Sequence, residues 1–386
     1  MGLARPLPLG EERIASFCRY GGRGALPRRR RRGIAKRITG APQCFGADQG
    51  EEQERGIVAE PETIHFRGRV ERVQRNWLLG GINYYVLEEL GMAGRKRFRA
   101  FDATGGPQGA YRAILVLPHG PEAEQQADVW QRLSQNNSNV PTVLHYCVEQ
   151  DEIVLVCVWV EGEDLARLQE RIRMGRAARV SAAEACQLIR GLAHGMGHFH
   201  HQRNVVHGDI KPANLVVARE PNRLVMIDFG SSWLVERTTG RQAGDGVTRG
   251  YASPEQLTEQ LGIGFQSDQF SVCVVWYELL TGMLPYDGLG GQAGIPEYRL
   301  TMAKKYVVPS QLSPDRQRLP GDVWSRIDAC VTRGLSLDAS DRYPDKSSWL
   351  NALDEIQYAL KHRSQLGPSH NVALKWLDWL SRPWRR

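Results

Sequence analysis

The sequence contains no long hydrophobic run, and no stretch approaches the roughly 18 consecutive apolar residues that a membrane-spanning helix requires. Its first residues also lack the apolar core of a secretory signal. The seven cysteines among the 386 residues form no C-x-x-C pair, which argues against a disulfide framework and against a zinc site. We therefore expect a cytoplasmic protein with reduced cysteines.

Positive charge is distributed unevenly along the chain. The net charge is +7, and residues 28–32 near the start are five consecutive arginines. No aromatic residues alternate with this run, so it carries no specific nucleic-acid signal. We expect residues 1–80 to be a basic and largely disordered region, in which the ambiguous stretch at 63–82 could hold a short strand or helix. It is either a solvated tail or an arm that contacts a protein or an anionic membrane surface.

The last residues form a second tail with a different composition. Residues 363–386 are rich in tryptophan and leucine and end in basic residues. Such a segment either packs its aromatic side chains on its own domain or contacts a partner or a membrane surface. The second alternative would make the protein peripherally membrane-associated.

Between the two tails, residues 81–362 carry the patterns of one folded domain. Apolar runs with strand character predict strands at 83–91, 97–101, 110–117, 142–148 and 153–158, and a helix at 122–133. From residue 164 onward the apolar spacing is mainly helical. It predicts helices at 164–174, 182–201, 268–281, 322–334 and 346–358.

Residues 207–214, which read HGDIKPAN, and the DFG at 228–230 place four groups of phosphoryl-transfer chemistry in a short span. The Asp209 carboxylate can orient a hydroxyl nucleophile and accept its proton, and Lys211 can neutralise the transferred phosphoryl group. Asn214 and Asp228 supply the oxygen ligands that Mg²⁺ prefers. Short apolar runs flank both loops and predict strands that fix the loops in place.

This spacing resembles the catalytic loop and metal-binding loop of eukaryotic-type serine/threonine protein kinases, including bacterial ones. The resemblance extends to Glu255 in ASPE, to Asp268 as a brace of the catalytic loop, and to Arg342 as the partner of Glu255. It implies an α+β two-lobed kinase fold. The N-lobe, at about 81–163, would hold a five-stranded antiparallel sheet and one helix, and the mostly helical C-lobe would occupy about 164–362.

The same resemblance implies ATP and Mg²⁺ as cofactors and a protein as the phosphate acceptor. The nucleotide-binding residues that it indicates are Gly91 in the glycine-rich loop, Ala113 and Val216 around the adenine, and the backbone of Val158 and Val160. Lys211 matches the serine/threonine subgroup. Thr248 resembles the threonine that contacts the catalytic aspartate and lysine.

The sequence departs from the family where the nucleotide phosphates would be bound. The third strand of kinases carries a lysine, but Leu115 occupies that position here, and two of the three glycines of the glycine-rich loop are replaced. With-no-lysine kinases instead use a lysine at the third glycine position, which alignment assigns here to Lys96. We expect Lys96 to bind the phosphates. Its usual helix partner would be Gln126, or Glu122 or Glu124 if the register shifts.

Three functions follow from these observations. The first is an ATP-dependent serine/threonine protein kinase. The second is a pseudokinase that acts as a nucleotide-binding or scaffold protein, which Leu115 favours and which Phe98, as a bulky residue near the adenine pocket, would also favour. The third is a small-molecule kinase, against which Glu255 and Asp268 argue.

Overall fold

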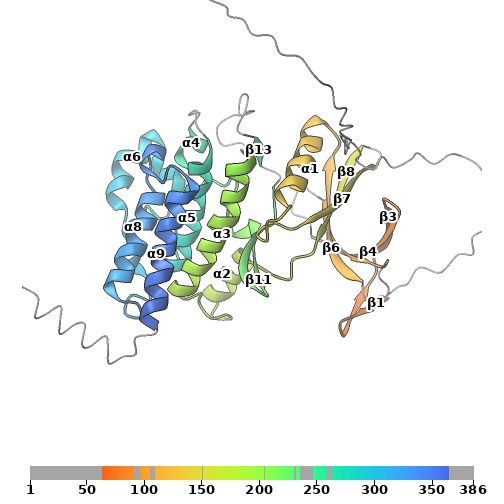
Figure 1. The fold of residues 1–386 in the computed structure, drawn as a ribbon, viewed down its shortest axis with the longest axis horizontal. Helices are drawn as coiled ribbons and strands as arrows, with labels where there is room; N and C mark the ends of the chain where they lie inside the picture. The colour runs from red at the N-terminus through yellow and green to blue at the C-terminus, as the bar shows by residue number, and fades with distance from the viewer. Residues whose placement is uncertain are drawn as a thin grey trace, which may run out of the picture. The chain divides into compact units, whose positions relative to one another are not determined.

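The computed structural model describes residues 63–90, 96–104, 109–149, 151–203, 205–229, 232–234, 247–258 and 263–364 (Figure 1). The arginine run at 28–32 and the Trp-rich tail from residue 365 lie outside these residues, and so does Gly91. No helix in the described ranges is long and apolar enough to cross a membrane.

The N-lobe is built on one antiparallel sheet of six strands in the order β3-β4-β5-β6-β8-β7. The strands are β3 (Arg75–Leu79), β4 (Ile82–Glu89), β5 (Lys96–Asp102), β6 (Ala110–Pro118), β7 (Val143–Glu149) and β8 (Glu152–Val158). Helix α1 (Pro121–Leu133) connects β6 to β7. The five predicted strands and the predicted helix are all present.

The predicted domain boundary at residue 81 and the predicted strand count of five both need correction. Strand β3 pairs with β4 through the turn at Gly80 and Gly81, so a boundary at residue 81 would cut a hairpin. A second hairpin precedes it, formed by β1 (Thr63–Phe66) and β2 (Arg69–Arg72). Each of these strands has only four residues, too few to show a clear apolar period in the sequence.

The β1–β2 hairpin packs on the N-lobe sheet next to the connection between the lobes. The Phe66 ring lies 4.9 Å from that of Phe101 and 5.2 Å from that of Tyr111, between centroids. Arg99 donates to both Glu71 carboxylate oxygens, at 2.9 and 2.7 Å. Tyr111 donates to the same carboxylate at 3.0 Å. The hairpin is thus fastened to β5 and β6 by aromatic packing and by a nearly buried ion pair.

Replacing Glu71 by alanine should loosen this hairpin. Arg99 and Tyr111 would each lose a charged acceptor, which we expect to cost about 1–3 kcal/mol of unfolding free energy. Urea unfolding would measure the loss, and trypsin should cut faster after Arg67. Glu89→Ala, at an exposed site on β4, is the control and should change neither. Equal behaviour of the two variants would show that the ion pair does not fasten the hairpin.

The two faces of the N-lobe sheet bury different residues, because side chains alternate along a strand. One face packs against α1 and buries Leu115, Leu117 and Leu155 together with Trp130 of that helix. The opposite face forms a separate cluster that contains Phe98, Ile114 and Val156. Consecutive residues of β5 therefore point to opposite sides of the sheet.

The C-lobe is mainly helical. Its helices are α2 (Leu165–Arg173), α3 (Ala182–Arg203), α4 (Pro254–Leu257), α5 (Phe265–Thr281), α6 (Pro296–Met302), α7 (Pro309–Leu312), α8 (Gly321–Gly334) and α9 (Lys346–Ser364). Helices α3, α5, α8 and α9 pack side by side (Figure 1). Helix α5 is buried along almost its whole length and ends at Gly282, whose φ of 84° lies in the left-handed region.

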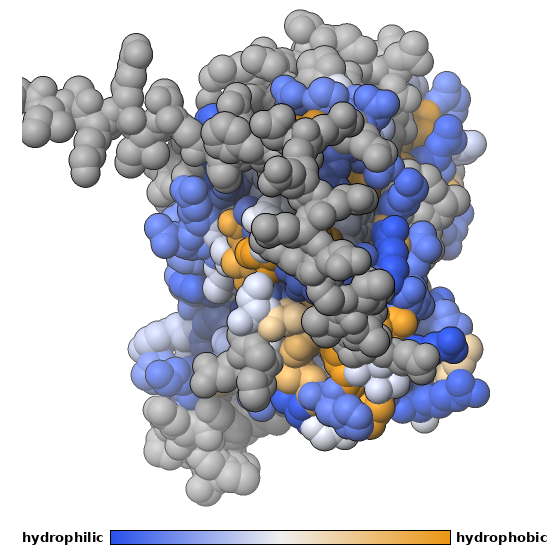
Figure 2. All heavy atoms as spheres, turned by 90° about the vertical axis from the view of Figure 1, so that its right-hand side faces the viewer, coloured by the Kyte–Doolittle hydropathy of each residue, from blue (hydrophilic) through white to orange (hydrophobic). Residues whose placement is uncertain are grey.

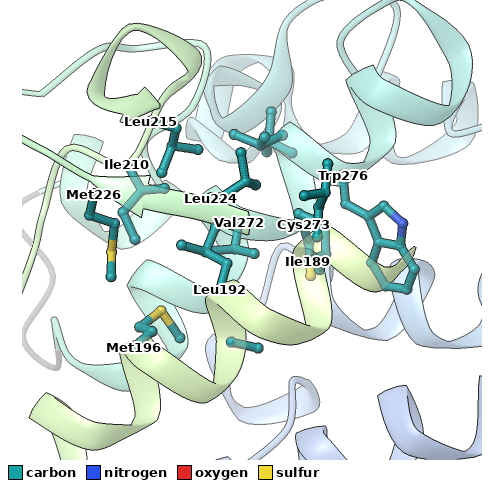
Figure 3. Close-up of a cluster of buried hydrophobic side chains, with 14 of the residues drawn as sticks. Ile189, Leu192, Met196, Ile210, Leu215, Leu224, Met226, Val272, Cys273 and Trp276 are labelled. Carbon is teal, nitrogen blue, oxygen red and sulfur yellow. The ribbon is translucent and has the colours of Figure 1, made fainter. Parts of the chain in front are cut away.

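Short strands carry the loops that face the N-lobe. Strands β9 (Gly162–Asp164), β11 (Leu215–Arg219) and β12 (Asn222–Met226) form one sheet, and β10 (Val205–Val206) pairs with β13 (Trp233–Leu234). Ile210 from the loop before β11 and Leu215, the first residue of β11, are buried in one cluster with Leu192 of α3 and Val272 of α5 (Figure 3). This packing holds the predicted catalytic loop against the core of the C-lobe.

Hydrophobic residues at the surface are scattered. In the face shown in Figure 2, most coloured residues are hydrophilic and the hydrophobic ones form small separate areas. The exposed apolar side chains of the N-lobe include Val70, Leu78 and Leu144. Single exposed apolar residues are normal on a protein surface, so they do not mark a site by themselves.

Candidate active site

The loop between β10 and β11 brings Asp209, Lys211 and Thr248 into one network. The Lys211 Nζ lies 2.7 Å from one Asp209 carboxylate oxygen and donates to the Thr248 hydroxyl, also at 2.7 Å. The Thr248 hydroxyl and backbone N–H donate to the other oxygen at 2.9 and 3.1 Å. Both Asp209 oxygens are therefore oriented, and a cation stands beside the carboxylate, as phosphoryl transfer to a hydroxyl requires.

Asn214 lies at the end of this loop, and Asp228 follows β12, directly after the residue whose backbone bonds to Asn214. Asn214 donates its amide N–H to the Asp209 backbone oxygen at 2.9 Å and to its carboxylate at 3.2 Å. The Ile227 N–H donates to the Asn214 carbonyl at 3.0 Å, which brings Asp228 close to the loop. The Asn214 amide oxygen and the Asp228 carboxylate are hard donors of the kind that Mg²⁺ takes together with phosphates.

Asp268 holds the backbone of the catalytic loop in place through hydrogen bonds. It is fully buried and accepts the backbone N–H groups of His207 at 2.7 Å and Gly208 at 2.9 Å. It also contacts the His200 Nε2 at 2.8 Å. Burial alone would raise the pKa of Asp268, but its contact with His200 and the backbone donors lower it below the ordinary value. A charged group thus fixes the backbone of the two residues that precede Asp209.

A column of rings connects α1 to this brace. The Phe229 ring lies 5.4 Å from that of Trp130 on α1 and 4.8 Å from that of His207, between centroids. Burial lowers the pKa of His207, although the nearby carboxylates of Asp268 and Asp228 act in the opposite direction. The position of Asp228 is thereby coupled to the placement of α1. Trp130 was not predicted as a member of this column, because its contact with Phe229 joins segments far apart in the sequence.

Glu255 and Arg342 form a buried ion pair behind the segment that contains Thr248. Two guanidinium nitrogens of Arg342 donate to the two Glu255 oxygens at 2.7 and 3.0 Å. The neighbouring Gln256 donates to the Gly208 carbonyl at 2.8 Å. The pair therefore supports a helix that is itself hydrogen-bonded to the catalytic loop. Sequence reasoning did not identify Gln256.

The predicted adenine-binding residues lie where the two lobes connect. Ala113 is paired with Cys157 on β8, and Val216 on β11 is paired with Asp164 on β9. Val158 donates its backbone N–H to the Thr142 carbonyl at 2.9 Å, so the backbone group that it can offer to a base is its carbonyl. Val160 follows in the connection to β9. Cys157 is fully buried, and burial raises the pKa of its thiol to about 12.

Phe98 does not crowd this pocket. It lies in the cluster on the opposite face of the sheet, where its ring contacts Trp77 at 5.7 Å between centroids. Arg75 covers both rings, with its guanidinium carbon 4.6 Å from the Phe98 centroid. Phe98 therefore does not favour a pseudokinase.

Lys96 points away from the cleft, contrary to the prediction. It lies on the same face of β5 as Phe98, and its Nζ contacts Glu152 at 2.8 Å. Its side chain is 62% exposed. The alignment of the glycine-rich loop with the kinase pattern was one residue off. A shift of one residue moves a strand side chain to the other face of the sheet.

Arg97 takes the place that the prediction gave to Lys96. It is the direct cross-strand partner of Leu115, so the two side chains share the face toward the cleft. Its Nη2 donates to the Asp228 carboxylate at 2.5 Å. A guanidinium thus lies across the strand pair from Leu115, the position where the family carries its lysine. This pairing is a property of the sheet, and no local pattern in the sequence identified Arg97.

The structure describes only some of the α1 residues that were expected to pair with the phosphate-binding lysine. Glu124 contacts His119 at 3.1 Å and is exposed, so it does not point into the cleft. The side chains of Glu122 and Gln126 lie outside the described residues. In the described part of the chain, no group of three or more His, Cys, Asp or Glu residues could hold a metal, and His200 instead contacts Asp268.

Comparison with known proteins agrees with this geometry. A family model described as a protein kinase domain matches residues 121–342, more than half of the chain. Human ribosomal protein S6 kinase alpha-4 is 31% identical over 250 residues, which are 62% of this chain and 31% of that protein. Serine/threonine-protein kinase pkn3 of Myxococcus xanthus is 27% identical over 248 residues, 60% of this chain and 41% of that protein.

The chain thus spans less than half the length of these two relatives. Among solved structures, the PK-1 kinase of Cydia pomonella granulovirus matches with a TM-score of 0.56 at 22% identity. The match covers 70% of this chain and 93% of that one, and it supports the protein kinase fold. The chain belongs to the protein kinase domain family, within its eukaryotic-type serine/threonine group.

Proposed function

We propose that this chain is an ATP-dependent serine/threonine protein kinase that transfers the γ-phosphoryl group to a protein hydroxyl. The observation that carries the proposal is the network of Asp209, Lys211 and Thr248, in which both carboxylate oxygens are oriented. A substrate hydroxyl placed beside Asp209 would be oriented by the carboxylate and would lose its proton to it. Lys211 would stabilise the charge of the transferred group.

Asn214 and Asp228 would hold Mg²⁺ with the nucleotide phosphates, because their amide and carboxylate oxygens are suitable donors. The metal would supply neutralisation of the phosphate charge. Arg97 would bind the phosphates in the role first assigned to Lys96. A guanidinium is well suited to it, since its planar fork can donate two hydrogen bonds to one phosphate.

A pseudokinase is the second candidate, and one contact favours it. The Arg97 guanidinium lies on Asp228 at 2.5 Å, so the carboxylate that would bind the metal is already paired. A chain that kept this pair closed would bind nucleotide or a partner without transferring phosphate. The orientation of Asp209 favours the kinase, because a scaffold has no chemical need for it.

A labelling experiment separates the two candidates. We expect the wild type to transfer radiolabelled phosphate from Mg·ATP to itself or to a model protein. Arg97→Ala should lower the rate by at least about tenfold through the loss of a charge-assisted phosphate contact. Lys96→Ala, the matched control on the outer face, should keep the wild-type rate.

Two results would reject the kinase proposal. Wild-type protein that binds ATP but labels no protein would leave the pseudokinase. Labelling of a small hydroxylated molecule in place of protein would favour the small-molecule kinase.

A further inference from the structure

Arg97 and Asp228 form the ion pair that connects β5 of the N-lobe to the loop after β12. The contact is short, at 2.5 Å, and the two side chains are 26% and 13% exposed. Arg97 makes it with one terminal nitrogen, Nη2. A charge-assisted hydrogen bond in such a sheltered position is stronger than one on the open surface.

The guanidinium retains a donor for a ligand. The Arg97 Nε is buried, and no acceptor for it exists among the described residues. A buried donor without an acceptor is costly, and it is usually satisfied in a bound state. Because Arg97 shares a face with Leu115, this donor lies on the side of the sheet where the family binds the nucleotide phosphates.

Among the described residues, Arg97 forms an ion pair with Asp228. Asp209 is already neutralised by Lys211, and Asn214 is uncharged. The single positive charge of Arg97 therefore neutralises the Asp228 carboxylate, as part of the charge of a divalent cation would. A cation that approached Asp228 while Arg97 stayed in place would be repelled by the guanidinium.

We propose that Arg97 occupies the position of the divalent cation between Asp228 and the nucleotide phosphates, so that this chain binds ATP in the absence of Mg²⁺. In the metal-free complex, Arg97 keeps its contact with Asp228 and donates from its remaining N–H groups to the phosphates. When Mg²⁺ is present, Asp228 and Asn214 would hold it, and Arg97 would then contact the phosphates alone. This inference rests on the nucleotide site of the proposed function but not on phosphoryl transfer.

The test is the dissociation constant of ATP, measured by isothermal titration calorimetry in EDTA and again in MgCl₂. For the wild type, we expect the two values to agree within about threefold. Arg97→Ala should weaken binding by at least about tenfold in EDTA and by clearly less in MgCl₂, where Mg²⁺ can take Asp228 unopposed. Lys96→Ala should match the wild type under both conditions.

A second variant keeps the proposal testable if Arg97→Ala fails to fold. Asp228→Asn removes the carboxylate that repels the phosphates and leaves Arg97 free to bind them. We expect it to bind ATP in EDTA at least as tightly as the wild type and to lose its response to MgCl₂. Thermal unfolding of each variant without nucleotide would report whether it is folded.

Wild-type binding that appears only with MgCl₂ would overturn the inference. So would an equal loss for Arg97→Ala under both conditions, which would make Arg97 an ordinary phosphate contact. A protein that binds ATP in EDTA through Arg97 but labels nothing in MgCl₂ would retain this inference and lose the proposed kinase activity.

Discussion

Asp209→Asn should lower the rate of protein phosphorylation by about 10²–10⁴-fold, the usual contribution of a positioned general base. The asparagine keeps the size of the side chain and an oxygen that can accept from Thr248. It loses the negative charge that attracts the substrate proton and pairs with Lys211. The measurement is the initial rate of labelling at saturating Mg·ATP.

Binding of ATP and folding should change little in this variant, because Asp209 faces the hydroxyl acceptor. Asp354→Asn on α9 is the matched control, since it also removes a carboxylate from an ion pair, with Arg190, but at an exposed site. It should keep the wild-type rate. Labelling by Asp209→Asn at more than about a tenth of the wild-type rate would exclude Asp209 as the base.

Arg342→Ala should cost about 3–5 kcal/mol of unfolding free energy, because it leaves the Glu255 carboxylate buried without its partner. Arg342 is fully buried and also donates to the carbonyls of Gln266 and Ser336. These three acceptors lie in different segments, so the loss is not confined to one helix. Urea unfolding followed by circular dichroism would measure it.

The control for this prediction is an ion pair of the same residue types on the surface. Arg326 contacts Glu355 at 2.9 Å, and both side chains are largely exposed. Arg326→Ala should therefore cost at most about 1 kcal/mol. If the two alanine variants lost equal stability, burial would not be the source of the strength of the Glu255 pair.

The pH dependence of this pair has a definite sign. Burial would raise the pKa of Glu255, but the hydrogen bonds and charge of Arg342 outweigh it and lower the pKa below the ordinary 4.5. The stability that the ionised pair contributes is complete above pH 4.5 and is lost as the pH falls through the lower folded value. The difference in stability between wild type and Glu255→Gln should therefore shrink in acid.

The helices and the central strands could be predicted because their apolar spacing is regular. The strand at 110–117 and the helix at 182–201 are examples, observed as β6 and α3 with shifts of one or two residues. The β1–β2 hairpin could not be predicted in the same way. Its stability depends on Glu71 and Phe66 contacting β5 and β6, and such long-range contacts leave no local period.

The site was predictable where chemistry fixes residue type and spacing within one loop. Asp209, Lys211 and Asn214 lie in such a loop, and the structure brings them together. The sequence placed Lys96 on the face toward the cleft, where the structure has Arg97, because the altered glycine-rich loop offered no reliable alignment. The pairing of Arg97 with Leu115 decides it, and that pairing is a property of the sheet.

The central claim is that Arg97 replaces the lysine that Leu115 has displaced. It is tested most directly by the ATP affinity of Arg97→Ala compared with that of the double variant Arg97→Ala/Leu115→Lys, both in MgCl₂. Residues 97 and 115 are direct cross-strand partners, so a lysine at 115 can reach the same phosphates. We predict weakened binding in the single variant and substantial recovery in the folded double variant. Wild-type affinity in Arg97→Ala would contradict the claim.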